Sequence, residues 1–130
     1  PTDLSNTESV TTFVNNVNDI LGDQPVNALV NNAAVSPKTP YQERLGCLNG
    51  DLDRWREVFE LNLFTPLLLA RGFAGALGRG AKDSGGAIVN IASIAGHAIH
   101  PFAGSAYSSA TMTKRRPTMG RMQCWPTKSR

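Results

Sequence analysis

The sequence contains few of the residues that build disulfide frameworks or metal sites. It has 2 cysteines and 2 histidines in 130 residues, and neither Cys47 nor Cys124 stands at a metal-ligand spacing. So low a cysteine content favours a reducing compartment. His97 and His100 have no carboxylate or cysteine at such a spacing either, so we expect no metal and interpret them as loop residues beside a substrate.

Long apolar runs are missing as well, and no stretch is long enough to cross a membrane. The chain opens with Pro1, Thr2 and Asp3 rather than with a basic segment followed by an apolar core. We therefore predict a cytoplasmic protein without a membrane partner, or a chain whose true start lies further upstream. A composition of 41% hydrophobic and 18% charged residues fits a single globular domain.

Acidic residues are absent from one end of the chain. Residues 111–130 contain six basic residues and no acid, although the whole chain has a net charge of only +3. Residues 1–110 therefore hold seven basic and ten acidic residues, a net charge of −3. A mildly acidic body argues against a nucleic acid as partner. We predict a domain over residues 1–110 and a basic, irregular tail over residues 111–130.

Two helices are marked by their ends and by their apolar spacing. Ser5 and Glu8 have the spacing of a capping box, which predicts a helix that begins after Ser5 and ends at Gly22. Asp51 caps a second, long helix that we expect to run to about Leu77. The apolar stripe of the first helix comprises Val10, Phe13, Val14, Val17, Ile20 and Leu21.

Pro66 stands within the second predicted helix, four residues after Asn62. Because proline has no N–H, the backbone carbonyl of Asn62 loses its helical partner, and we expect a kink there. The freed carbonyl can hold a water molecule. The alternative is a buried Asn62 whose side chain bonds only to its own backbone.

Short β-branched apolar runs predict strands at Val26–Val30 and Ala87–Ile91. The second run has the composition of a parallel strand that is covered on both faces. Open α/β sheets bind ligands at the carboxyl ends of their strands. Ser93 follows the second run and Tyr107 follows the next loop, so we expect the two to converge on a ligand. We interpret Gly78–Gly80 as an ordinary connecting loop, because a dinucleotide loop must follow a strand and open a helix.

Four signatures, in the order of the family, resemble the short-chain dehydrogenase/reductase family. They are Asn31-Asn32-Ala33-Ala34, Asn62 within Leu-Asn-Leu-Phe, Ser93 within Ile-Ala-Ser-Ile-Ala-Gly, and Tyr107. The resemblance covers residues 1–110 and implies an α/β fold, a partial Rossmann-like doubly wound parallel sheet. The sheet is expected to be truncated, because no glycine-rich phosphate loop is present. The implied reaction is hydride transfer between NAD or NADP and a small carbonyl or alcohol substrate, and the family suggests a homo-oligomer.

The resemblance also implies roles for individual residues. Tyr107 is the expected acid/base, Ser93 orients the substrate oxygen, and Asn62 carries a water relay. In the family, an Asp followed by an apolar residue before the first helix contacts the adenine of the cofactor, so the resemblance makes Asp3 and Leu4 candidate cofactor residues. An ordinary turn residue is an equal alternative for Asp3. The expected cofactor-binding residues are Asp3, Leu4, Asn31, Asn32, Ala33 and Tyr107.

One residue departs from the family pattern. The family has a lysine four residues after the tyrosine, and this position holds Thr111, which cannot lower the pKa of a tyrosine. Three explanations of the tail stay open: a shifted reading frame or mispredicted terminus, which we prefer, a genuine basic tail, and divergence to a non-catalytic homologue. The rival function is a catalytically inactive binding or dimerising module of the same fold. With so few strands, we expect the chain alone to fold poorly or to associate through apolar faces.

Overall fold

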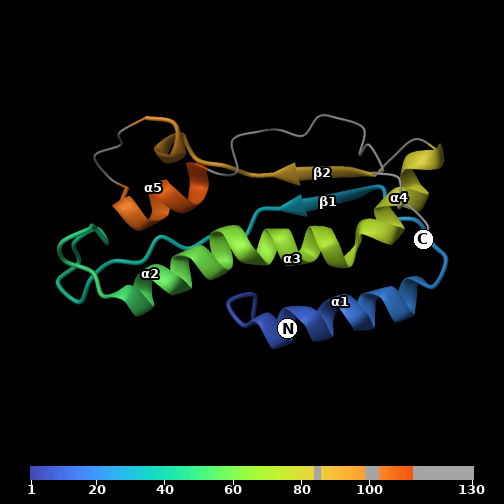
Figure 1. Cartoon of the computed structure of the whole chain (residues 1–130), viewed down its shortest axis with the longest axis horizontal. Coiled ribbons are helices and arrows are strands. Elements are labelled where there is room, and N and C mark those ends of the chain that lie inside the picture. Colours follow the sequence, from blue (N-terminus) through green and yellow to red (C-terminus); the bar gives the residue numbers. More distant parts are fainter. Residues whose placement is uncertain (84–85, 99–102, 113–130) are drawn as a thin grey trace, which may run out of the picture.

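Two short parallel strands lie on one side of the helices, which pack against one face of the strand pair (Figure 1). The structure is a computed structural model that describes residues 1–83, 86–98 and 103–112. This mixed architecture with a parallel strand pair confirms the partial α/β fold. The elements in chain order are α1 (Thr7–Leu21), β1 (Ala28–Asn31), α2 (Leu52–Phe59), the π-turn η1 (Glu60–Phe64), α3 (Thr65–Gly72), α4 (Ala74–Asp83), β2 (Ala87–Asn90), the 3₁₀ turn η2 (Ile94–Gly96) and α5 (Ser105–Met112).

The two strands share one covered face. They pair in parallel from Ala28 opposite Ala87 to Asn31 opposite Asn90, and the chain crosses between them through α2, α3 and α4. Side chains alternate along a strand, and Leu29 and Ile88 pack toward α1 and α3. On the other face Val30 and Val89 are 57% and 43% exposed. The prediction that the second strand is covered on both faces is therefore wrong for the described residues.

The first helix begins one residue later than predicted. Asn6 is its cap, with a side-chain oxygen that accepts from the Ser9 N–H at 2.9 Å, so the predicted capping box at Ser5 is wrong. The physical reason is that Asn6 takes the cap position, while the Ser5 hydroxyl donates to the Asp3 carboxylate at 2.7 Å. The end at Gly22 is confirmed, with φ at +52°, a left-handed conformation that glycine adopts without strain.

The second predicted helix is present but interrupted. Asp51 caps α2 as predicted, accepting from the Arg54 N–H at 2.8 Å. The kink expected near Pro66 stays a prediction, and the structure has the π-turn η1 here, which ends at Phe64. A second break follows at Phe73, where the helix axis bends by 60°.

The interpretation of Gly78–Gly80 as a loop is wrong, because α4 runs through these residues to Asp83. A Cβ on Gly80 would lie 2.4 Å from the carbonyl oxygen of Val26, so α4 packs here directly on the segment before β1. The Arg79 guanidinium also donates to two carbonyl oxygens after α1, at 3.0 and 3.2 Å. These tertiary contacts override the low helix propensity of glycine.

The buried apolar residues form two clusters. The cluster that we call the N-terminal core comprises Val10, Val14, Leu69, Phe73 and Leu77. The cluster that we call the α5 core comprises Leu45, Val58, Ala106 and Ala110. Ile20, expected in the apolar stripe of the first helix, is 84% exposed and belongs to neither cluster.

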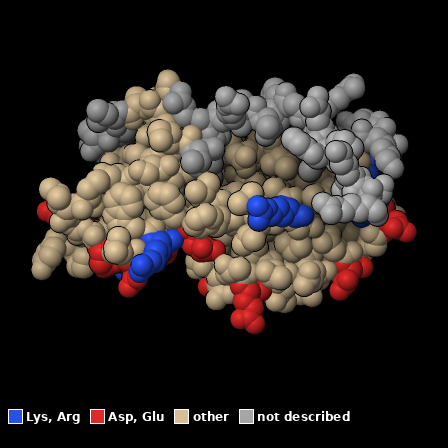
Figure 2. Space-filling view, in the orientation of Figure 1, with Lys and Arg blue, Asp and Glu red and all other residues tan. Residues whose placement is uncertain are grey.

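Acidic side chains lie along the edge of α1 and α2 (Figure 2). On α2, Arg54 pairs with Glu57 at 2.9 Å and Arg56 with Asp53 at 2.6 Å. Exposed pairs of this kind contribute between about 0 and 1 kcal/mol. We interpret this edge as a solvated surface.

No single helix in residues 1–83, 86–98 and 103–112 has both the length and the apolar character to cross a membrane. The bent pair of Leu52–Gly72 and Ala74–Gly80 meets that test only jointly, by length and composition. Its residues Val58, Leu69 and Leu77 are buried in the two clusters.

Candidate functional site

A pair of asparagines joins the carboxyl ends of the two strands. Asn31 is 5% exposed, and its side-chain amide donates to the side-chain oxygen of Asn90 at 2.8 Å. The backbone N–H of Ile91 donates to the Asn31 carbonyl at 2.9 Å, which extends the pairing past the strand ends. The side-chain oxygen of Asn31 is buried and has no hydrogen-bond donor among the described residues.

The residues after Asn31 are small and open to solvent. Asn32, Ala33 and Ala34 are exposed, and the alanines leave their backbone accessible. A buried acceptor without a donor, beside such a segment, is a place where a bound polar group can supply the missing hydrogen bond. These residues fit a polar ligand that lies across the strand ends.

Asn62 is fully buried in η1 and clamps the segment that follows Ala34. Its side-chain oxygen accepts from the Val35 N–H at 2.8 Å, and its side-chain amide donates to the Val35 carbonyl at 2.8 Å. The alternative in which this side chain bonds only to its own backbone is therefore wrong. The freed backbone carbonyl stays a prediction, although π-turns such as η1 occur frequently at functional sites.

Ser93 follows β2 and caps η2. Its hydroxyl oxygen accepts from the Ala95 N–H at 3.2 Å. A serine hydroxyl can donate one hydrogen while it accepts. Ser93 can therefore donate its hydrogen to a ligand while the backbone of η2 fixes the oxygen.

Tyr107 lies on α5, which packs against η2, α2 and η1 beyond the carboxyl ends of the strands (Figure 1). The approach of η2 to α5 is close, because a Cβ on Gly96 would lie 2.7 Å from the carbonyl carbon of Thr111. The elements that carry Asn62 and Tyr107 and the turn that Ser93 caps thus form one packed unit.

Thr111 is 1% exposed, and its hydroxyl is occupied by its own helix. It donates to the carbonyl of Tyr107 at 2.9 Å and to that of Ser108 at 3.2 Å. The position where the family has a cation is therefore filled by a neutral, internally bonded side chain. Lys114 and the rest of the predicted tail from residue 113 lie outside the described residues.

Asp3 and Leu4 form a turn before α1. The carboxylate of Asp3 accepts from the Ser5 hydroxyl at 2.7 Å and from the Ser5 N–H at 2.9 Å. These two hydrogen bonds hold the pKa of Asp3 below its ordinary value. Asp3 also donates its own N–H to the Ser9 hydroxyl at 3.1 Å. The geometry is that of a turn residue, and cofactor binding by Asp3 stays a prediction.

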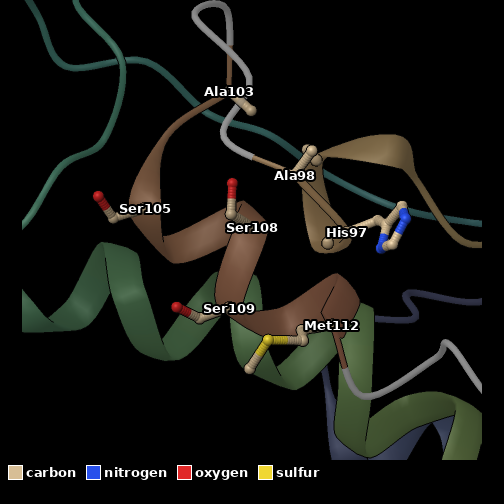
Figure 3. Close-up of a pocket in the computed structure, with 9 residues that line it drawn as sticks. His97, Ala98, Ala103, Ser105, Ser108, Ser109 and Met112 are labelled. Carbon is tan, nitrogen blue, oxygen red and sulfur yellow. The ribbon is translucent and has the colours of Figure 1, made fainter.

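A cavity of about 350 Å³ lies between η2 and α5 (Figure 3). Ser108 points toward the gap between Ala98 and Ala103, whereas the imidazole of His97 points away from it, so these side chains form no serine–histidine pair. His100 lies outside the described residues. Within the described ranges, no group of three or more His, Cys, Asp and Glu residues is placed to hold a metal ion.

Two contacts of the site were missed from the sequence. Asn90 stood within a predicted strand, but its pairing with Asn31 depends on the strand register. Thr65 gave no signal, yet its hydroxyl donates to the Leu4 carbonyl at 2.7 Å across 61 residues of sequence. Both contacts join segments that are distant in the chain.

The chain matches the family described as short chain dehydrogenase over residues 1–115. Among curated proteins it is 44% identical to Protein FixR of Bradyrhizobium diazoefficiens over 108 residues, which are 83% of this chain and 37% of that protein.

Two solved structures show the same likeness in three dimensions. An oxidoreductase (short chain dehydrogenase/reductase family) from Brucella ovis, in complex with a partially ordered NAD, is 35% identical with a TM-score of 0.80, and the match covers 87% of this chain and 50% of that one. A metagenomic short-chain oxidoreductase in complex with NADP is 30% identical with a TM-score of 0.67, over 87% of this chain and 46% of that one. The chain thus spans about half the length of these solved structures.

Proposed function

Because the chain belongs to the short-chain dehydrogenase family, we propose that it is part of an NAD- or NADP-dependent oxidoreductase acting on a small carbonyl or alcohol substrate. One observation supports this proposal above the others. The elements η1 and α5, which carry Asn62 and Tyr107, and η2, which Ser93 caps, pack together beyond the carboxyl ends of β1 and β2 (Figure 1). This is the edge at which open α/β sheets bind ligands.

The side chains at this edge have complementary proton chemistry. A carbonyl that is reduced develops negative charge on its oxygen and needs a proton donor and an orienting hydrogen bond. In our proposal Tyr107 is the donor and Ser93, fixed by the Ala95 N–H, supplies the orienting bond. The backbone carbonyl of Asn62 holds a water molecule that replaces the proton of Tyr107.

A nicotinamide cofactor supplies or accepts the hydride when it is bound. The buried, unsatisfied oxygen of Asn31 and the exposed backbone after it fit such a group. We leave the choice between NAD and NADP open, since one of the two similar structures contains NAD and the other contains NADP. The residues that would hold the cofactor are Asp3, Leu4, Asn31, Asn32, Ala33 and Tyr107.

Fluorescence titration of the chain with NADH and with NADPH tests the proposal. We expect nicotinamide fluorescence to change on binding of at least one of the two. An Asn31→Leu variant, which lacks the unsatisfied oxygen, should bind more weakly than the wild type. Absence of binding at cofactor concentrations on the order of millimolar would contradict the proposal for this chain.

A second candidate function is a catalytically inactive binding or dimerising module of the same fold. Thr111 favours it, because a hydroxyl bonded to the carbonyls of Tyr107 and Ser108 supplies no positive charge to a tyrosine. Measuring alcohol oxidation with NAD and NADP in the wild type and in Thr111→Lys separates the two functions. Cofactor binding without turnover, and turnover only in the lysine variant, would favour the inactive module.

We also propose a cytoplasmic location and a homo-oligomeric assembly, with no nucleic-acid or membrane partner. Cys47 is a free, exposed thiol, which fits a reducing compartment. Cys124 lies outside the described residues.

A further inference from the structure

We propose that Thr65 is a positioning residue for the dinucleotide. Its hydroxyl holds the Asp3–Leu4 turn at a fixed place relative to the strand ends, and thereby sets how well the adenosine half of the cofactor binds. The inference rests on the proposed function and assigns a role to a residue outside the family motifs given above.

The contact that carries the inference is partly buried and joins two segments distant in sequence. Thr65 is 2% exposed, and its hydroxyl donates to the Leu4 carbonyl at 2.7 Å. The Leu4 side chain packs against the N-terminal core, so the turn is held both by its backbone and by apolar contact. Loss of the hydroxyl would leave the Leu4 carbonyl, which lies in a partly buried contact, without this partner, and such a loss is destabilising.

The same π-turn region holds the other segment proposed to contact the cofactor. Asn62 fixes the backbone of Val35, directly after the Asn31–Ala34 segment. Glu60 adds a further link to the start of α1, because its carboxylate accepts from the Thr7 hydroxyl at 2.8 Å. Residues 60–65 therefore connect the turn before α1 to the segment after β1, and they set the distance between the two.

The π-turn explains how neighbouring side chains reach such different segments. The Thr65 N–H donates to the Glu60 carbonyl, so this turn contains one residue more than an α-helical turn. Each residue of an α-helix rotates the side-chain direction by about 100°. The extra residue therefore turns Thr65 relative to a regular continuation of α2, and in the structure Thr65 contacts Leu4 while Asn62 contacts Val35.

The test compares ligands that contain or lack adenosine. Binding of NADH, NADPH and reduced nicotinamide mononucleotide is measured for the wild type, Thr65→Val and Thr65→Ser. Thr65→Val removes the hydroxyl and retains the shape, so we expect dinucleotide affinity to fall about tenfold and mononucleotide affinity to be unchanged. Thr65→Ser retains the hydroxyl and should bind all three ligands like the wild type.

Thr11→Val is the matched control, because Thr11 is exposed and its hydroxyl donates only within α1, to the Thr7 carbonyl at 2.8 Å. It should change no affinity. Hydrogen exchange without ligand gives an independent measurement: the amides of residues 3–6 should exchange faster in Thr65→Val and not in Thr65→Ser. If Thr65→Val is too unstable for titration, Thr65→Ala replaces it, and its hydrogen exchange is compared with that of Thr65→Ser.

Unchanged exchange at residues 3–6, or equal weakening of dinucleotide and mononucleotide binding, would overturn the positioning role. A wild-type chain that binds neither dinucleotide would instead overturn the proposed function, and the inference with it. The two failures are distinguishable because the second involves no variant.

Discussion

The N-terminal core and the α5 core differ in the size of some of the buried side chains that form them. In the first, large side chains interlock, and the rings of Phe13 and Phe73 meet edge to face with centroids 6.2 Å apart. In the second, the buried residues on α5 are Ala106 and Ala110, and the neighbouring backbone comes close enough that a Cβ on Gly104 would lie 2.5 Å from the Leu45 carbonyl oxygen.

The difference shows where this fold places stability and where it places the candidate site. Large buried side chains stabilise in proportion to the apolar area that they remove from water. Alanine and glycine contacts bury less area but let backbones approach, and they hold α5 with Tyr107 against η2 with Ser93. The stability of the first region should therefore fall most when a buried side chain is made smaller, and that of the second when a side chain is made larger.

Leu77→Ala should have the largest effect, because Leu77 is fully buried in the N-terminal core. Truncation of a buried leucine costs the transfer energy and leaves a cavity, so we expect a loss of about 3 kcal/mol in the free energy of unfolding. Urea denaturation measures it, and a cooperative transition of the monomeric chain would also contradict the expectation that the chain folds poorly alone. Ile20→Ala, at a residue that is 84% exposed, is the control, and a similar loss there would contradict the assignment of the core.

Gly96→Ala tests the opposite sensitivity. The added Cβ would lie 2.7 Å from backbone atoms of Thr111 and Met112, so α5 must move, and we expect a loss of about 2 kcal/mol. Gly78→Ala is the control, because nothing lies within 4 Å of its Cβ and a helical alanine should stabilise by about 0.5–1 kcal/mol. Denaturation curves that rank these two variants the other way round would refute the comparison.

Asn62→Leu breaks the clamp on Val35 between the two regions. Both side-chain hydrogen bonds are lost, and because Val35 is only half-buried, water can replace part of them. We expect a loss of about 1.5 kcal/mol. Hydrogen exchange should show faster exchange of the Val35 amide, and an unchanged exchange rate there would count against the clamp.

The smallest effect is the pH dependence contributed by Asp3. Ser5 lowers the pKa of Asp3 in the folded chain below the ordinary value of 3.8. The folded state therefore favours the carboxylate, and this stabilisation is present above the ordinary pKa and is lost as the pH falls through the lower folded pKa. An NMR titration should show the Asp3 pKa rising toward its ordinary value in Ser5→Ala. An identical titration in both proteins would exclude the Ser5 hydroxyl as the cause.

Local signals predicted much of the fold correctly. The cap at Asp51 and the end at Gly22 each depend on neighbours in sequence, and both are confirmed. The strand predicted at Val26–Val30 is present but lies at Ala28–Asn31. Ser5 failed as a cap because Asn6, one residue later, supplies the oxygen that accepts from the Ser9 N–H. Gly78–Gly80 failed as a loop because α4 packs against the segment before β1, a contact that no local pattern encodes.

The sequence by itself determined the family, the parallel α/β character and the choice of Asn62, Ser93 and Tyr107 as candidate residues, because these depend on residue type and order. The tertiary structure decided which segments these residues hold. The Asn31–Asn90 pair, the clamp of Asn62 on Val35 and the Thr65–Leu4 hydrogen bond all join residues separated by 27 to 61 positions. Such contacts exist only once strand register and helix rotation are set, and here the register of β1 with β2 and the extra residue of the π-turn set them.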